Sequence, residues 1–286
     1  MIPIVHTTWL NEEVDTDGHS PMHFRCDDGN FYYCKYRTQF KRAELDCLVY
    51  EIVCHYLLKR LHVPTPDIAL AVIEKGSYDI KKLRKNKRYI EQGIICFASK
   101  EVTNTALVTG IQSFSKKSQV NKFESIYDLL KIAMFDLWIE NVDRGRGSME
   151  NYNLLIQSIQ VQNEETKEVR DKLRWIAFDH AFAFGGTNNL RIFNQTMLPS
   201  LSFKLIESQY FKSVKKYFNS VDCENIVEFF LDLQPYELEA IIQSIFKQLP
   251  AEWETPKNLG DRIVTFLSDP GRIRSVKQLT IHSLKN

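Results

Sequence analysis

A polar loop between two strongly apolar segments is the feature that most constrains how this chain of 286 residues folds. Residues 123–140 carry apolar side chains at three- and four-residue spacing, which predicts a helix. Residues 154–156 predict a short buried strand. The loop between these segments contains Asp143 and two asparagines, Asn151 and Asn153. We therefore expect the helix to deliver an acid into this loop, and the asparagines to lie just before the strand.

A second acid follows the next apolar run, because residues 175–178 end at Asp179. A phosphotransferase with a magnesium site uses one Asp to orient the attacking hydroxyl, and an Asn and a second Asp to hold the metal. Asp143, Asn153 and Asp179 occur in this order. Asp and Asn also favour turns for purely local reasons, so a turn is the alternative interpretation of each residue taken singly. The ordered combination favours the phosphotransferase.

Composition and charge exclude several classes of protein. Hydrophobic residues make up 44% of the chain and charged residues 26%, and the formal net charge is +1, so nucleic-acid binding is not indicated. The six cysteines form no CxxC pair, which favours buried free thiols in a reducing compartment. We see no signal peptide and no apolar run long enough to span a membrane. We therefore expect a cytoplasmic protein without a membrane partner.

The predicted secondary structure changes character after about residue 100. Strands are expected at residues 2–10, 22–25, 31–36, 68–73 and 93–97, with one amphipathic helix at residues 43–61. Two further strands, at residues 156–161 and 173–178, are expected to be joined by an exposed turn, and helices at residues 203–217, 222–233, 236–247, 258–268 and after Pro270. This pattern predicts an α+β protein in which a small sheet-plus-helix lobe and a larger helical lobe enclose a cleft.

Lys35 interrupts an aromatic strand, where burial of an unpaired ammonium group is costly. One interpretation is an edge strand that directs Lys35 to water. The other is a lysine that contacts phosphates and is held by a helix carboxylate. Glu51 lies mid-helix beside the apolar stripe and is a better candidate partner than Glu44, although a solvated helix carboxylate is the alternative.

Several segments, taken in order, resemble motifs of the HipA-like kinases, especially the shorter branch of HipA-related domains. The similarity extends from about Thr16 to about Phe266. The similar segments are residues 17–21, 26–30, 32–35, Glu51 with residues 61–66, residues 97–100, 141–144, 151–155, 178–181 and 249–253. Each motif is weak alone, and their common order makes the resemblance fairly specific.

The resemblance implies one bilobal domain with a protein-kinase-like fold over residues 1–286. Its β-rich N-lobe with one key helix would cover about residues 1–98, the hinge about 97–101, and the mainly helical C-lobe about 102–286. It further implies ATP and Mg²⁺ as cofactors and a serine/threonine protein kinase activity, with an unidentified protein as substrate. A nucleotide-binding pseudokinase that regulates a partner, or a kinase acting on a lipid or small molecule, remains the alternative.

The roles that the resemblance implies fall on particular residues. Asp143 would be the catalytic base, and Asn153 and Asp179 the metal ligands, with Asn151 as the alternative because about three extra residues follow Asp143. Lys35 would contact the phosphates and pair with Glu51. The implied nucleotide-binding residues are Gly18, His19, Ser20, Lys35, Glu51, Phe97, Ala98 and Ser99.

The sequence departs from familiar kinase motifs at two places. There is no G-x-G-x-x-G motif, since one glycine, Gly18, lies in the loop, and His180 stands where D-F-G has Phe. Arg144 is expected to stabilise either the loop or a phosphate. Ser113, Ser115 and Ser118 are candidates for autophosphorylation.

Overall fold

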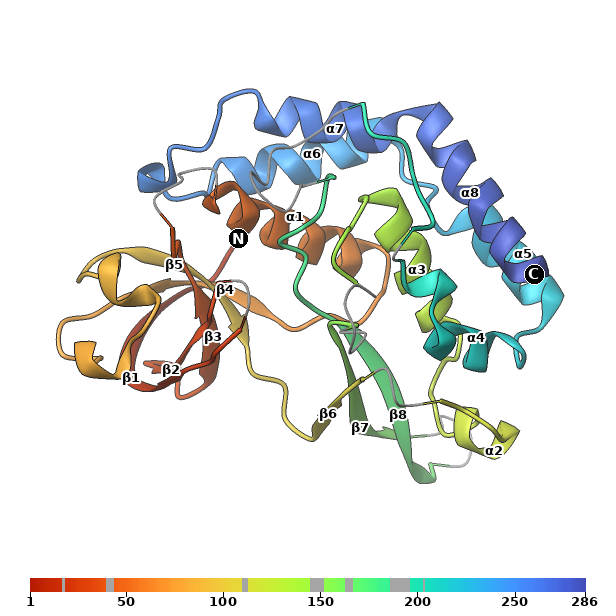
Figure 1. The fold of residues 1–286 in the computed structure, drawn as a ribbon, viewed down its shortest axis with the longest axis horizontal. Helices are drawn as coiled ribbons and strands as arrows, with labels where there is room; N and C mark the ends of the chain where they lie inside the picture. Colours follow the sequence, from red (N-terminus) through yellow and green to blue (C-terminus); the bar gives the residue numbers. More distant parts are fainter. Residues whose placement is uncertain are drawn as a thin grey trace.

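The computed structural model describes residues 1–16, 19–39, 44–109, 113–144, 152–162, 167–185, 196–202 and 204–286. A small barrel and a larger, mainly helical part lie side by side (Figure 1). The chain passes between them after the last barrel strand. Within the described residues, no helix is both long and apolar enough to cross a membrane.

Five strands form the small part and close into a barrel in the order β1-β2-β3-β5-β4. Their bounds are β1 (Ile4–Glu13), β2 (Met22–Cys26), β3 (Phe31–Lys35), β4 (Ile68–Val72) and β5 (Ile95–Lys100). Strands β1 and β4 pair in parallel and the other pairs are antiparallel. A closed barrel has no edge strand, and β3 lies between β2 and β5. The edge-strand interpretation of Lys35 is therefore wrong.

Helix α1 (Asp46–Arg60) lies between the barrel and helix α6 (Pro235–Phe246) (Figure 1). Most of its side chains are buried, on all sides of the helix, including that of Glu51. The expectation of a single apolar face was therefore wrong, because a second layer of helices covers the side that would otherwise meet water. This second layer makes Glu51 a buried carboxylate, not a solvated one.

The larger part contains a three-stranded antiparallel sheet in the order β6-β7-β8. The strands are β6 (Thr105–Leu107), β7 (Leu154–Gln162) and β8 (Val169–Ala177). Helix α3 (Asp128–Trp138) packs against β8 and begins five residues later than residue 123, where we predicted its start. Phe123 instead forms an isolated bridge with Leu173 and stacks on Trp175 with ring centroids 3.7 Å apart. This tertiary contact replaces the first predicted turn of helix.

Helices form the rest of the larger part. They are α2 (Lys117–Val120), α4 (Gln209–Lys215), α5 (Ser220–Phe229), α6, α7 (Leu259–Ser268) and α8 (Pro270–Lys285), with short 3₁₀ helices at Leu205–Glu207 and Ala251–Trp253. Two further 3₁₀ helices, Ile80–Lys82 and Asn86–Arg88, lie in the connection between barrel strands β4 and β5. The single helix predicted at residues 203–217 is divided, because Ser208 has extended backbone angles and caps α4 by accepting a hydrogen bond from the Phe211 N–H.

The C-terminal part of the chain returns to the barrel. Trp253 donates a hydrogen bond from Nε1 to the Ile95 carbonyl at 2.9 Å, and Glu252 accepts one from the Ile95 N–H at 2.7 Å. Gln248 accepts a hydrogen bond from the Ile2 N–H at 2.7 Å. These contacts hold the barrel against the helical part in addition to the β5–β6 connection.

Candidate active site

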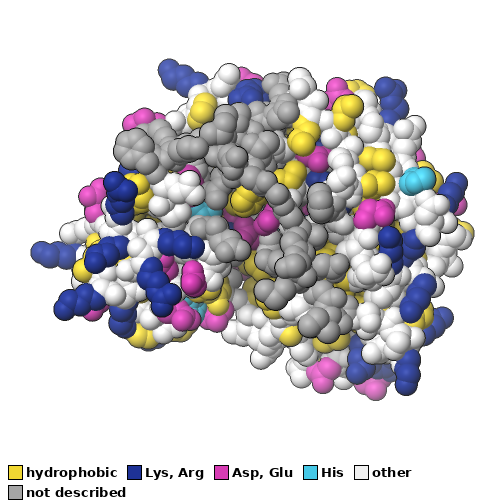
Figure 2. All heavy atoms as spheres, viewed as in Figure 1, with side chains coloured by type: hydrophobic (Ala, Val, Ile, Leu, Met, Phe, Trp, Pro, Cys, Tyr) yellow, Lys and Arg dark blue, Asp and Glu magenta, His cyan; other side chains and the backbone are white. Residues whose placement is uncertain are grey.

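A cleft of about 800 Å³ lies between the barrel and the larger part. The barrel contributes Lys35 on β3, and the larger part contributes Asp143, Asn153 and Asp179. Figure 2 shows acidic side chains near the hollow at the centre of this face. The structure therefore brings the predicted catalytic acid, metal ligands and lysine to one cavity.

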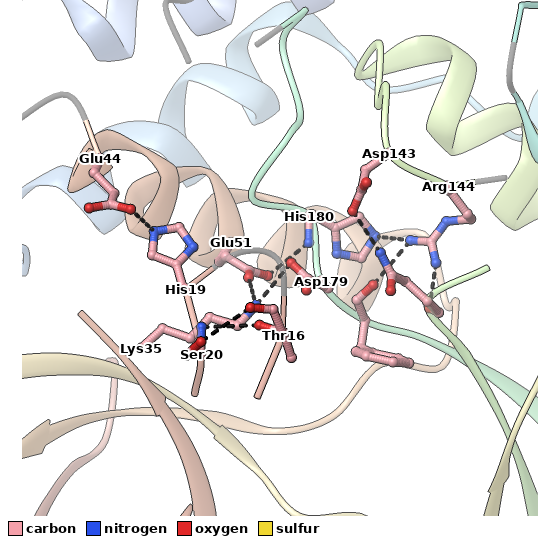
Figure 3. A network of polar contacts seen from close by, with 12 residues as sticks. Thr16, His19, Ser20, Lys35, Glu44, Glu51, Asp143, Arg144, Asp179 and His180 are labelled. Atoms are coloured by element: carbon pink, nitrogen blue, oxygen red, sulfur yellow. Dashed lines mark hydrogen bonds and ion pairs between the residues drawn. The ribbon is translucent and has the colours of Figure 1, made fainter. Parts of the chain in front are cut away.

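Lys35 stands at the centre of a three-residue charge cluster (Figure 3). Its Nζ lies 2.5 Å from Oε1 of Glu51 and 2.9 Å from Oδ1 of Asp179. The other carboxylate oxygen of Glu51 accepts a hydrogen bond from the backbone N–H of His180 at 2.9 Å. The predicted pairing of Lys35 with Glu51 is confirmed, and its extension to Asp179 joins the two parts across the cleft.

Burial and charge set the protonation of this cluster. Burial raises the pKa of Glu51 to about 7, although the charge of Lys35 opposes the rise. For Lys35, burial lowers the pKa, but the carboxylates of Asp179 and Glu51 outweigh burial and raise it overall. Burial also raises the pKa of Asp179, but Lys35 outweighs it and holds that pKa below its usual range. We therefore expect charged Lys35 and Asp179 at neutral pH, and a Glu51 that takes up a proton more readily than an exposed glutamate does.

Asp143 lies opposite this cluster and contacts Asn153. The side-chain amide of Asn153 donates a hydrogen bond to Oδ2 of Asp143 at 3.0 Å. The Asp143 N–H donates to the side-chain oxygen of Asn141 at 3.3 Å. The pKa of Asp143 is raised by burial and then by the negative charge of Asp179. A cation between these carboxylates would relieve their repulsion.

Two of these residues have unusual backbone angles. The φ angle is +45° at Asn153 and +57° at Asp179, in the left-handed region that Asn and Asp tolerate better than most residues. The Phe178 N–H donates a hydrogen bond to the Asn153 carbonyl at 3.2 Å and so joins the two segments. The choice of Asn and Asp at these positions therefore suits both the backbone and the chemistry.

Arg144 follows Asp143 and is fully buried. Its guanidinium group donates hydrogen bonds to the backbone carbonyls of Tyr152, at 2.7 Å, and of Asn153. Of the two expected roles, a contact to the loop is therefore the one that the structure shows.

The predicted phosphate loop is described only in part. Gly18 lies outside the described residues. His19 lines the cleft and is buried, with Nε2 3.7 Å from Oε1 of Glu44. Ser20 is buried, does not line the cleft, and donates its backbone N–H to Oγ1 of Thr16 at 3.1 Å. The phosphate contacts of this loop stay a prediction, and the geometry favours His19 and Thr16 over Ser20.

The predicted hinge lies on β5, where successive side chains point to opposite faces of the strand. Phe97 and Ser99 line the cleft, whereas Ala98 between them is fully buried and points to the other side. Glu101 and Val102, which follow β5, line the cleft as well.

An apolar wall of the cleft was missed by the sequence analysis. Tyr33, Ile68, Leu107 and Leu155 line it. One of these residues, Tyr33, carried a usable signal, because it lies two residues before Lys35 on β3 and side chains two apart on a strand share a face. Leu155 had none of this kind, since Asn153 precedes β7. Leu107 had no such signal, since none of the strands expected from the sequence covers the short strand β6.

The carboxylate of Asp179 and the amide oxygen of Asn153 are ligand types that suit a magnesium ion, which binds one or two carboxylates together with substrate phosphates. The described residues contain no group of three or more His, Cys, Asp or Glu side chains that could hold a metal by themselves. A metal here would therefore take part of its coordination from a nucleotide. Asn151, the alternative ligand, lies outside the described residues.

A family model described as HipA-like kinase matches residues 12–229. The chain belongs to the HipA-like kinase family. The resemblance inferred from the motifs is thus confirmed, together with the α+β kinase-like fold, and the protein is a kinase-type phosphotransferase.

Solved structures with similarity along nearly the whole chain include three kinases. A Helicobacter pylori proinflammatory kinase, CtkA, is 13% identical, with 99% of both chains covered and a TM-score of 0.49. A Golgi casein kinase with Mn/ADP bound is 15% identical, with 99% of this chain and 73% of that chain covered and a TM-score of 0.48. The Rio2 kinase of Chaetomium thermophilum is 10% identical, with 98% of this chain and 72% of that chain covered and a TM-score of 0.39. Comparison with curated proteins found no significant match.

Proposed function

We propose that this HipA-like kinase uses ATP and Mg²⁺ to phosphorylate a serine or threonine hydroxyl of a protein substrate. The observation that carries the proposal is the position of Lys35, whose ammonium group contacts Glu51 at 2.5 Å and Asp179 at 2.9 Å within one cleft. This arrangement places a cation next to the two acids, where it would meet the phosphates of a nucleotide.

Each residue would have a separate task in the transfer. Asp179 and Asn153 would hold Mg²⁺, which neutralises the developing charge on the phosphates when it is bound. Lys35 would contact the phosphates and stay in position through Glu51. Asp143 would orient the acceptor hydroxyl and take its proton, and its raised pKa makes it a better proton acceptor than an ordinary carboxylate. Catalysis would come mainly from positioning and charge neutralisation.

The apolar wall supports a nucleotide as the ligand. Tyr33, Ile68, Leu107 and Leu155 provide a surface for a flat base, and the β5 backbone around Ser99 runs beside it. We also propose a single domain over residues 1–286, since Gln248 returns to contact Ile2. The six buried free cysteines support a cytoplasmic location.

Intact-mass measurement after incubation with ATP and magnesium tests the proposal. We expect a gain of phosphate on the protein itself or on an added protein extract, and its loss in Asp143→Asn. Asp128→Asn is a matched control, because Asp128 is a buried acid of helix α3 that does not line the cleft. Wild-type transfer by Asp143→Asn would overturn the assignment of the base. Nucleotide binding without any transfer or hydrolysis of the γ-phosphate would instead establish a pseudokinase.

A further inference from the structure

Arg144 uses its whole guanidinium group inside the protein (Figure 3). Four of its N–H groups donate hydrogen bonds, and their acceptors are the carbonyls of Tyr152, Asn153 and Phe178 and the ring atom Nε2 of His180. The fifth N–H group, on Nε, is buried against Asp136, with Nε 2.7 Å from Oδ2 as an ion pair. An arginine has five N–H groups, and the full burial of Arg144 leaves none of them to contact a phosphate.

The acceptors of Arg144 belong to two separate segments. Tyr152 and Asn153 precede strand β7, whereas Phe178 and His180 follow strand β8 and flank Asp179. Arg144 thus touches the backbone immediately around both proposed metal ligands. These ligands have positive φ angles, which cost free energy unless the surroundings hold them.

The position of Arg144 is fixed in turn by helix α3. Asp136 of α3 is fully buried and pairs with Nε, while its Oδ1 accepts a hydrogen bond from Asn141 at 3.1 Å. His180 must be the acceptor toward Arg144, because a guanidinium group only donates. Burial and then the charge of Arg144 lower the pKa of His180, in agreement with a neutral ring.

We propose that Arg144 is a positioning residue that sets the spacing between Asn153 and Asp179 and thereby the affinity for Mg²⁺. The proposal rests on the proposed function, because it presumes that these two side chains hold the metal. A lysine cannot replace the arginine, since one ammonium group does not match the planar fork of donors. Loss of groups that orient metal ligands lowers metal affinity about 10- to 100-fold in other proteins.

The experiment measures the magnesium concentration at which a non-hydrolysable ATP analogue gives half of its maximal thermal stabilisation. For Arg144→Lys we expect this concentration to rise about tenfold or more. The matched control is Arg272→Lys. Arg272 is also a buried arginine, and it donates to the carbonyls of Trp138, Leu137 and Met197, but to neither metal segment. The Arg272→Lys variant should have a lower melting temperature and an unchanged magnesium midpoint.

The second variant is Asp136→Asn, which keeps Arg144 and removes the charge that holds it; we expect a smaller shift in the same direction. If Arg144→Lys does not fold, the magnesium midpoint of Asp136→Asn tests whether the position of Arg144 sets the affinity for magnesium. A wild-type magnesium midpoint in the folded Arg144 or Asp136 variant, or an equal shift in Arg272→Lys, would overturn this inference alone. A wild-type protein without any magnesium-dependent stabilisation would overturn the proposed function as well.

Discussion

The ammonium group of Lys35 lies 2.5 Å from Oε1 of Glu51 and connects barrel strand β3 to helix α1. Both side chains are less than one tenth exposed. The same ammonium group reaches Asp179 after strand β8, so a single lysine links the barrel, the helix and the larger part. Removal of either partner of a buried pair leaves an uncompensated charge in the interior.

We expect Lys35→Met to lower the free energy of unfolding by about 3 kcal/mol, because the buried carboxylate of Glu51 and the partly buried one of Asp179 lose their cation. The double variant Lys35→Met, Glu51→Gln should lose less than the sum of the single variants. Urea unfolding measures all three. Lys59→Met is the surface control, since Lys59 pairs with Asp67 at 2.9 Å with both side chains about half exposed or more, and it should cost about 1 kcal/mol or less. Equal losses at Lys35 and Lys59 would contradict the importance of burial.

Substitutions of Asn153 can separate the backbone requirement at this position from the function of the side chain. At a φ of +45°, alanine costs roughly 1 kcal/mol more than glycine, so Asn153→Gly should be more stable than Asn153→Ala. Both variants lack the amide that contacts Asp143, and both should lose magnesium-dependent nucleotide binding. Thermal melting with and without magnesium and a nucleotide measures the two effects together.

Asn151→Ala provides the comparison that decides between the two asparagines. We expect it to keep wild-type magnesium dependence. The reverse result, with loss in Asn151→Ala and wild-type behaviour in Asn153→Gly, would move the metal ligand to Asn151.

Local patterns were sufficient to predict the residues of the charge cluster. Lys35 stood out because a charged residue in an aromatic strand needs a partner, and Glu51 because it lay beside an apolar helix stripe. The order of Asp143, Asn153 and Asp179 along the chain was also visible. The structure brings all three residues to one cleft. Their roles in catalysis and metal binding stay predictions.

Contacts between distant segments were not predictable from such patterns. Phe123 continues the helical spacing of α3, yet stacks on Trp175 instead. The five partners of Arg144 lie on three different segments, and a sequence does not show which charge will be fully buried. Leu107 belongs to a three-residue strand whose hydrogen-bonded neighbour, β7, is almost fifty residues away.

Leu107 tests whether the apolar wall holds a nucleotide base. Its side chain is 50% exposed although it lines the cleft, so a bound base would cover it. Leu107→Ser should weaken nucleotide binding about fivefold, which corresponds to about 1 kcal/mol of lost apolar burial, and change stability little. Isothermal titration with ADP measures the affinity. Leu198→Ser is the control, since Leu198 is 74% exposed and does not line the cleft, and an equal effect of both variants would argue against this wall.

His55 should make stability depend on pH. Burial and then the charge of Lys59 lower the pKa of His55 from its ordinary value of 6.5 to about 4. The folded protein therefore binds fewer protons than the unfolded chain between these values, and the contribution of His55 to stability falls as the pH falls through this window. The shift corresponds to about 3 kcal/mol between pH 7 and pH 4.

The measurement is the difference in unfolding free energy between the wild type and His55→Leu across this pH range. Comparison with the variant is needed because Glu51, whose pKa is raised to about 7, contributes a slope of opposite sign. We expect wild-type stability to fall relative to that of His55→Leu as the solution becomes acidic. In Lys59→Met the fall should be smaller, since a positive charge next to the ring has been removed. Parallel stability curves for the wild type and His55→Leu would show that the ring is protonated in the folded state as readily as in the unfolded chain.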